Sequence, residues 1–145
     1  MAQDLPQDKI AKLKAIREES RLGGGEKRIA AQHEKGKMTA RERVDALLDK
    51  GSFQEINGLM KNRHTDFGLD KGKIPGDGMV AGFGTINGRK VCVYSQDFTV
   101  MGGSFGEVAG EKVARVMDLA MDAGVPVIGI NDGGGARIQE GIYSL

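Results

Sequence analysis

The sequence has 145 residues, of which 39% are hydrophobic and 28% charged, a composition typical of a globular chain rather than a disordered one. Lys and Arg (21 residues) nearly balance Asp and Glu (20 residues), and the net charge of +1 does not favour a nucleic-acid-binding surface or a polybasic membrane anchor. Cys92 is the single cysteine, which excludes an intrachain disulfide and a cysteine-based zinc site, and no apolar run approaches the roughly 20 residues of a membrane-spanning helix.

The N-terminus lacks the features of an export signal. It has no apolar signal core and carries Asp4 and Asp8 early, so it resembles neither a secretory nor a mitochondrial leader. We therefore expect a soluble protein in a reducing compartment, most simply a bacterial cytoplasm.

Three short helices are predicted in the N-terminal segment 1–50. The first has a loose apolar stripe and ends at Gly23–Gly25, and the second covers 26–35 with Ile29 and Ala30 facing inward. The stripe of the first helix consists of Ile10, Leu13 and Ile16. Helices this short need a body to pack on.

The third of these helices has the clearest start signal. Thr39 can cap it, and Glu42 stands three residues later, as in a capping box. Gly51 is the predicted C-terminal stop. The predicted buried face consists of Val44, Leu47 and Leu48.

A short strand and a long loop are predicted next. Ser52–Ile56 has the pattern of a strand, whereas 59–78 is polar and glycine-rich. The second stretch ends in a strong turn signal, Pro75-Gly76-Asp77-Gly78, and we expect it to be a mobile loop.

A β-hairpin is predicted after this loop. Its strands are Met79–Ile86 and Lys90–Gln96, joined by the turn Asn87-Gly88. Because the second strand is apolar on both faces, it should be covered on both sides. Val91 and Val93 occupy one of these faces, and Cys92 and Tyr94 the other.

The last predicted elements form a βαβ unit with the second hairpin strand. A helix is expected over 107–123 with a stop at Gly124, followed by the apolar strand Val125–Ile130 and a further helix that begins at Ala136. The inward face of the first helix consists of Ala109, Val113, Val116, Met117 and Ala120. A sheet edge and a helix would remain uncovered, so we expect the front portion of a larger α/β domain.

Two glycine clusters in this unit are candidate functional sites. Gly133-Gly134-Gly135 follows a predicted parallel strand and precedes a predicted helix, the position at which open α/β sheets bind ligands. Its unhindered N–H groups could hold a negatively charged oxygen, as in an oxyanion hole, with a plain tight turn as an equally good interpretation. Gly102-Gly103 precedes the other helix and is either a second such element or a loop that needs positive φ.

Other binding motifs are not supported. No glycine pattern fits a Walker A loop or a dinucleotide-binding fingerprint, and no acidic residues have the spacing of a metal-binding loop. His33 and His64 have no Ser, Cys or acidic partner at a recognisable spacing, so we expect solvated or capping roles. Cys92 is expected in the core, and no metal site is predicted.

Six runs of the sequence, in order, resemble one known family, the biotin-dependent acyl-CoA carboxyltransferases. The runs are 36–44 (GKMTARERV), 51–55 (GSFQE), 76–80 (GDGMV), 94–100 (YSQDFTV), 102–104 (GGS) and 134–141 (GGARIQEG). Within this family the runs resemble β-type subunits of propionyl-CoA carboxylase and the carboxyltransferase subunits of methylmalonyl-CoA and glutaconyl-CoA decarboxylases. A departure is Gly133, where the family usually has serine.

This resemblance implies a crotonase-like α/β fold built from ββα units. It implies that 1–50 is an N-terminal helical segment and that 51–145 is the first part of the acyl-CoA-binding domain, in a subunit with two such domains. The single cysteine argues against the β subunit of bacterial acetyl-CoA carboxylase, which typically has a four-cysteine zinc ribbon.

The resemblance also implies the chemistry. A carboxyl group would move between carboxybiotin, held by a partner carrier domain, and the α-carbon of an acyl-CoA such as propionyl-CoA or methylmalonyl-CoA. Backbone N–H groups of Gly134 and Gly135 would stabilise the thioester enolate. The residues expected to bind substrate are Gly102, Gly103, Ala136 and Arg137. Candidate cations for the CoA phosphates are Arg28, Lys37, Arg41 and Arg43, with ordinary solvated surface charge as the alternative interpretation.

The implied partners are a biotin carboxylase or biotin carboxyl carrier subunit and further copies in a homohexamer. Three alternatives stay open: a subunit of a biotin-dependent decarboxylase, a crotonase-like hydratase or isomerase, and a non-catalytic assembly segment. The hydratases normally add a glutamate as acid or base. We expect the 145-residue chain to be inactive alone.

Overall fold

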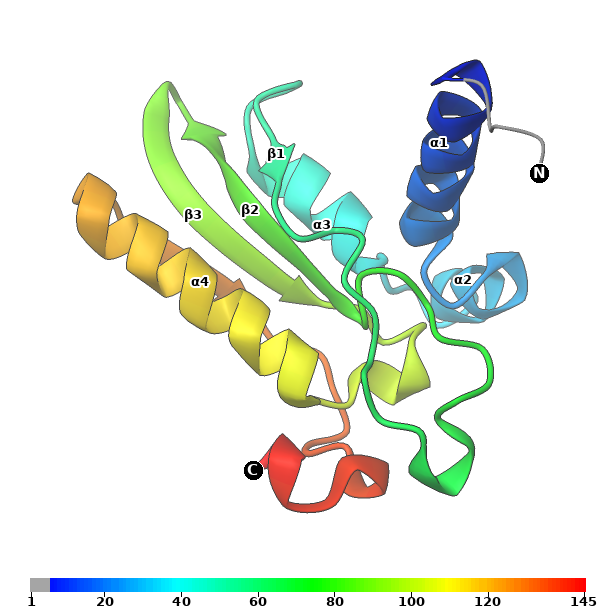
Figure 1. The fold of residues 1–145 in the computed structure, drawn as a ribbon. Coiled ribbons are helices and arrows are strands. Elements are labelled where there is room, and N and C mark those ends of the chain that lie inside the picture. Colours follow the sequence, from blue (N-terminus) through cyan, green and yellow to red (C-terminus); the bar gives the residue numbers. More distant parts are fainter. Residues whose placement is uncertain (1–5) are drawn as a thin grey trace.

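The fold is that of a computed structural model, which describes residues 6–145; the first five residues of the predicted N-terminal segment lie outside the described residues. A mixed four-stranded sheet in the order β1-β2-β3-β4 has helices on its two faces (Figure 1). The predicted α/β class is therefore confirmed.

The three predicted N-terminal helices are present as α1 (Pro6–Leu22), α2 (Glu26–His33) and α3 (Ala40–Leu47). The capping box of α3 is confirmed: the Thr39 hydroxyl accepts from the Glu42 N–H, and the Glu42 carboxylate accepts from the Thr39 N–H at 2.7 Å. The prediction that Gly51 ends α3 is wrong. The helix ends at Leu47 because Leu48 is already extended.

The apolar residues of α1 and α2 are less buried than their spacing predicts. Ile10, Leu13 and Ile16 are 54%, 39% and 37% exposed, since α1 stands apart from the sheet (Figure 1). In α2 the buried residue is Gln32, whereas Ala30 is exposed. The spacing of apolar residues predicts the helices correctly, but which face of each helix is buried depends on where the helix packs.

The sheet consists of β1 (Gln54–Glu55), β2 (Met79–Ile86), β3 (Arg89–Gln96) and β4 (Val127–Ile130). Neighbouring strands pair antiparallel except for β3 and β4, which are parallel. The predicted hairpin and the parallel crossover through α4 (Glu107–Ala123) are thus confirmed. Gly124 ends α4 in the left-handed conformation, as predicted.

Two apolar layers cover the two faces of β3, as its sequence predicted. Cys92 packs in one layer with α4, and Val93 in the other with α3. Two burial predictions are wrong. Met117 of α4 is 43% exposed, and β4 is half-buried to exposed rather than buried.

The segment between β1 and β2 is a loop with one short 3₁₀ turn, Asp66–Gly68, and the predicted turn at 75–78. Its mobility stays a prediction. The helix expected from Ala136 is wrong: the chain forms a 3₁₀ run, Ile138–Ser144, which the non-helical Gly141 interrupts. Within residues 6–145, none of the helices has the length and hydropathy needed to cross a membrane.

Candidate active site

The two glycine clusters predicted as candidate sites meet in the structure. The Gly134 N–H donates to the Gly102 carbonyl (3.0 Å), and the Phe105 N–H donates to the Gly135 carbonyl (2.8 Å). The Arg137 N–H returns a bond to the Phe105 carbonyl (2.8 Å), which completes a parallel bridge between Phe105 and Ala136. The two loops therefore form one site, although about 30 residues separate them in sequence.

Glycine is required where the loops touch. Gly103 has φ +65°, and a Cβ there would meet the Asp132 carbonyl oxygen and, at 2.9 Å, the Gly133 Cα. A Cβ at Gly133 would in turn meet the Gly103 carbonyl oxygen. Because a side chain at either position would collide with the backbone of the other loop, these glycines allow the loops to approach closely.

The backbone N–H groups that lack an acceptor are not the pair predicted as oxyanion donors. The Gly134 N–H is already bonded to Gly102, whereas none of the described residues accepts a hydrogen bond from the N–H of Gly135 or of Ala136. Both residues are exposed, and the bridge to Phe105 directs the Ala136 N–H to the opposite side of the segment. Because a 3₁₀ run rather than an α-helix follows, the expected support from a helix dipole is also absent from this part of the chain.

Asp132 anchors the second loop through its carboxylate. Arg43 Nη2 lies 2.5 Å from Asp132 Oδ2, and Lys37 Nζ lies 3.3 Å from Oδ1. Burial alone would raise the pKa of this carboxyl, but the hydrogen bonds and charges of the two cations hold the pKa below its usual value. Lys37 and Arg43, which the sequence offers as cations for the CoA phosphates, are thus paired with Asp132 in the structure.

Arg137 is buried rather than available to substrate. Its guanidinium is fully buried, and Nη1 lies 2.6 Å from Asp77 Oδ1 and 2.8 Å from Glu140 Oε1. Glu140 also accepts from the Asn62 amide and, at 2.7 Å, from the N–H of Glu107. Arg137 therefore ties the 75–78 turn to the start of α4, which corrects the expectation of a direct substrate contact.

The other two candidate cations lie in separate hollows. Arg28 donates to the Thr99 carbonyl (3.0 Å) at the edge of a cavity of about 270 Å³ that reaches Gly102. Lys35, Phe98 and Met101 also line this cavity, so it combines positive charge with apolar surface beside the first loop.

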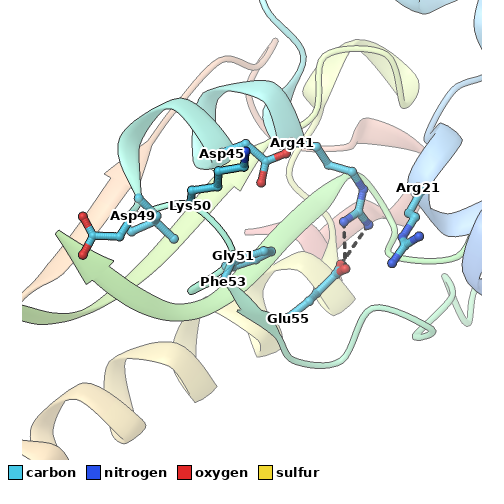
Figure 2. Close-up of a pocket in the computed structure, with 9 residues that line it drawn as sticks. Arg21, Arg41, Asp45, Asp49, Lys50, Gly51, Phe53 and Glu55 are labelled. Carbon is cyan, nitrogen blue, oxygen red and sulfur yellow. Dashed lines mark hydrogen bonds and ion pairs between the residues drawn. The ribbon is translucent and has the colours of Figure 1, made fainter. Parts of the chain in front are cut away.

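Arg41 lies in the larger hollow shown in Figure 2, of about 770 Å³, where it pairs with Glu55 at 2.8 Å. Three cations and three anions line this hollow, so it has no preference for either sign of charge. The lining charged residues are Arg21, Arg41, Lys50, Asp45, Asp49 and Glu55. None of its lining residues belongs to the glycine loops, and it is separate from the candidate active site.

Both histidines have acidic partners that sequence spacing did not reveal. His33 Nε2 lies 3.0 Å from Glu42 Oε1, and His64 Nε2 lies 3.0 Å from Glu107 Oε2. The described residues contain no group of three or more His, Cys, Asp and Glu that could hold a metal ion. Cys92 is buried as predicted, and burial raises the pKa of its thiol.

Sequence reasoning missed Asp132 and Gln96 as site residues. Both stand near the C-terminal ends of neighbouring parallel strands, Gln96 as the last residue of β3 and Asp132 two residues after β4. The carboxyl ends of parallel strands meet at one edge of a sheet, so this position was the signal that could have identified them.

Lys112 is a buried cation that contacts the 75–78 turn, and its titration should make the stability of the fold depend on pH. Its ammonium is fully buried and donates to the carbonyls of Gly76 and Met79. Burial lowers the pKa of Lys112 to about 8. Between about pH 8 and about pH 10 the unfolded chain then binds more protons than the folded one, so stability should rise with pH, by up to about 3 kcal/mol.

This rise should be measured by urea unfolding across that pH range. Lys112→Met should remove it, because the titrating group is gone, and should also lower stability by leaving two carbonyls without their donor. An equal rise in the variant would show that another group causes it.

The chain is similar to known proteins in both sequence and structure. The profile of the carboxyl transferase domain family matches residues 31–145. The propionyl-CoA carboxylase beta chain of Roseobacter denitrificans is 59% identical over 138 residues, which are 95% of this chain and 27% of that protein. A biotin-dependent acetyl-/propionyl-coenzyme A carboxylase beta5 subunit of Mycobacterium tuberculosis is 56% identical over 137 residues, which are 94% of this chain and 25% of that subunit.

A solved structure has the same fold over nearly all of the chain. Transcarboxylase 12S, in a hexamer assembly with methylmalonyl-coenzyme A and methylmalonic acid bound, superposes with a TM-score of 0.94 at 48% identity. The match covers 99% of this chain and 28% of that one, so the chain spans about a quarter of the length of its relatives. The predicted crotonase-like fold is confirmed.

Proposed function

Because the chain belongs to the carboxyl transferase domain family, we propose that it forms the acyl-CoA side of a biotin-dependent carboxyltransferase. The reaction moves a carboxyl group between carboxybiotin and the α-carbon of an acyl-CoA of the propionyl-CoA and methylmalonyl-CoA type. The observation that carries the proposal is the pair of interlocked glycine loops, which leaves the N–H groups of Gly135 and Ala136 without an acceptor in the described chain.

These two N–H groups are the proposed oxyanion donors. Loss of a proton or carboxyl group from the α-carbon puts negative charge on the thioester oxygen, and fixed N–H groups stabilise that charge without reorganising. One such donor is worth about 3–4 kcal/mol in other enzymes. Gly134 keeps a supporting role, since its N–H holds the two loops together. Carboxybiotin, on a partner carrier, supplies the carboxyl group.

The CoA moiety is proposed to lie along the cavity that reaches Gly102. Arg28 and Lys35 provide positive charge for phosphate groups, and Phe98 and Met101 provide apolar surface. Lys37 and Arg43 are assigned a different task, because both are already paired with Asp132. Arg41 lies in a separate hollow and is left out of the proposed substrate site.

The hydratase or isomerase alternative has less support. It needs a glutamate free to act as acid or base, and the glutamate that follows the second loop, Glu140, is buried and bonded to Arg137 and Asn62. By analogy with transcarboxylase 12S and the biotin-dependent relatives, we propose a hexameric assembly and a biotin-carrying partner. The cytoplasmic location expected from the sequence is likewise a proposal.

Carboxyl transfer from free carboxybiotin to propionyl-CoA tests the proposal, using the complete subunit that contains this chain. We expect methylmalonyl-CoA to form. Arg28→Met should raise the KM for propionyl-CoA about tenfold, because the variant loses one charge-assisted contact to a CoA phosphate. Lys27→Met, an exposed neighbour on α2 outside the cavity, is the matched control and should leave KM unchanged.

Absence of transfer to propionyl-CoA, acetyl-CoA and longer acyl-CoA thioesters alike would contradict the proposed function. The 145-residue chain by itself serves as the comparison for the non-catalytic alternative. We expect no transfer from it, since the matched relatives are far longer. Activity only in the complete subunit would mean that the carboxybiotin site lies outside residues 1–145.

A further inference from the structure

Gln96 bridges the two glycine loops with one side-chain amide. Its Oε1 accepts from the Asp132 N–H at 2.9 Å, and its Nε2 donates to the Gly103 carbonyl at 3.3 Å. The residue is 9% exposed, and a Cβ at Gly133 would lie only 2.9 Å from Nε2. The amide is therefore packed against the point where the loops meet.

The bridge requires both functions of a glutamine. One planar amide offers an acceptor and a donor at a fixed separation, and here each is used by the main chain of a different loop. A glutamate would present a second acceptor to the Gly103 carbonyl, and a methionine would satisfy neither group.

The same bridge holds Asp132 from its backbone side. Arg43 and Lys37 hold its carboxylate, while Gln96 holds its N–H, so the residue just before Gly133 is fixed from two directions. The orientation of the peptide groups that follow depends on this fixed point, because the next anchors are the bonds of Gly134 and Gly135 to the first loop.

From this arrangement we infer that Gln96 is a positioning residue, which sets the spacing of the two loops and thereby directs the N–H groups of Gly135 and Ala136. The inference rests on the proposed function, in which those N–H groups hold the thioester oxygen. Gln96 itself touches no reacting atom in this assignment. Its effect should therefore be seen in turnover and not in acyl-CoA binding.

The test uses the complete subunit with free carboxybiotin and propionyl-CoA. Gln96→Met should lower kcat about tenfold to thirtyfold with the KM for propionyl-CoA within about threefold, because small displacements of aligned groups reduce rate more than binding. Ser95→Ala is the matched control. Ser95 is the buried neighbour on β3, its hydroxyl has no partner among the described residues, and its loss should leave kcat unchanged.

Gln96→Glu adds a second measurement, the pH dependence of kcat, which would not change if Gln96 served only to fill space. When ionised, the new carboxyl repels the Gly103 carbonyl, and kcat should be low. When protonated, it can donate to Gly103 while accepting from Asp132, so kcat relative to wild type should rise as the pH falls. This pH response is expected in that variant and absent from Gln96→Met.

Two outcomes distinguish a failure of the proposed function from a failure of the role assigned to Gln96. An inactive wild-type subunit would overturn the proposed function and this inference with it. An active wild type with unchanged kcat in Gln96→Met would overturn the inference alone. Should Gln96→Met fail to fold, Gln96→Glu decides, since it matches glutamine in size: a pH profile parallel to wild type would refute the positioning role.

Discussion

Gly103→Ala should reduce carboxyl transfer by at least about 100-fold, the loss that follows when reacting groups move by about 1 Å. The new methyl group would overlap the Asp132 carbonyl oxygen and crowd the Gly133 Cα, so the second loop must move away from the first. The displacement acts directly on the peptide groups that lead to Gly135 and Ala136, the proposed oxyanion donors. The steady-state rate of carboxyl transfer from carboxybiotin to propionyl-CoA measures this loss.

Gly88→Ala separates this effect from backbone strain. Gly88 has φ +76° in the hairpin turn, close to the φ of +65° at Gly103, but no atom lies within 4 Å of a Cβ placed there. Both substitutions incur about 1 kcal/mol for the left-handed backbone, and only Gly103→Ala should lose turnover. Equal activities in the two variants would mean that the contact between the loops is unimportant for catalysis.

Arg137→Met should lower the free energy of unfolding by about 3–5 kcal/mol, since removing one partner of a buried ion pair leaves the remaining charges without compensation. Asp77 and Glu140 both bond to the Arg137 guanidinium and are almost fully buried. Methionine keeps much of the side-chain volume, so the loss reports the charge rather than a cavity. Urea unfolding of the chain with and without the substitution measures the difference.

The matched control is Arg63→Met. Arg63 also pairs with a carboxylate, Glu111, at 2.5 Å, but it is about half exposed, so its loss should cost less than about 1 kcal/mol. Comparable losses in the two variants would contradict the role assigned to burial.

The stability loss in Arg137→Met should depend on pH. Burial raises the pKa of Asp77 above its usual value, although Arg137 opposes this. The contribution of a group with a raised pKa is fully present below the unfolded pKa and is lost as the pH rises through the folded one. Without Arg137 the pKa of Asp77 should rise further, so the deficit should be smaller at acid pH than at neutral pH.

Most elements of the fold can be predicted from the sequence because they depend on residues that are close together in the chain. The capping box of Thr39 and Glu42, the Asn87-Gly88 hairpin and the stop of α4 at Gly124 all depend on residues within a few positions of one another. The two apolar faces of β3 likewise predicted cover on both sides, because strand residues alternate between faces. Short-range rules suffice for such features.

Sequence analysis predicts the two glycine clusters of the candidate site but not the contact between them. The two clusters meet because β3 pairs with β4 and Phe105 bridges to Ala136. In that arrangement Gly134 donates to Gly102, and the N–H groups of Gly135 and Ala136 have no acceptor among the described residues. No local signal distinguishes a glycine N–H that another loop accepts from one that none does.

The basic residues illustrate the same limit most clearly. Sequence marks Lys37, Arg43 and Arg137 as cations, and each is expected to be solvated or to bind an anionic substrate. In the fold, Lys37 and Arg43 pair with Asp132, 95 and 89 positions away. Arg137 pairs with Asp77, 60 positions away, as well as with Glu140, which is 3 positions away. Sequence determined the charges, but only the tertiary structure decided the pairs with Asp132 and Asp77, because an ion pair needs proximity in space and not in the chain.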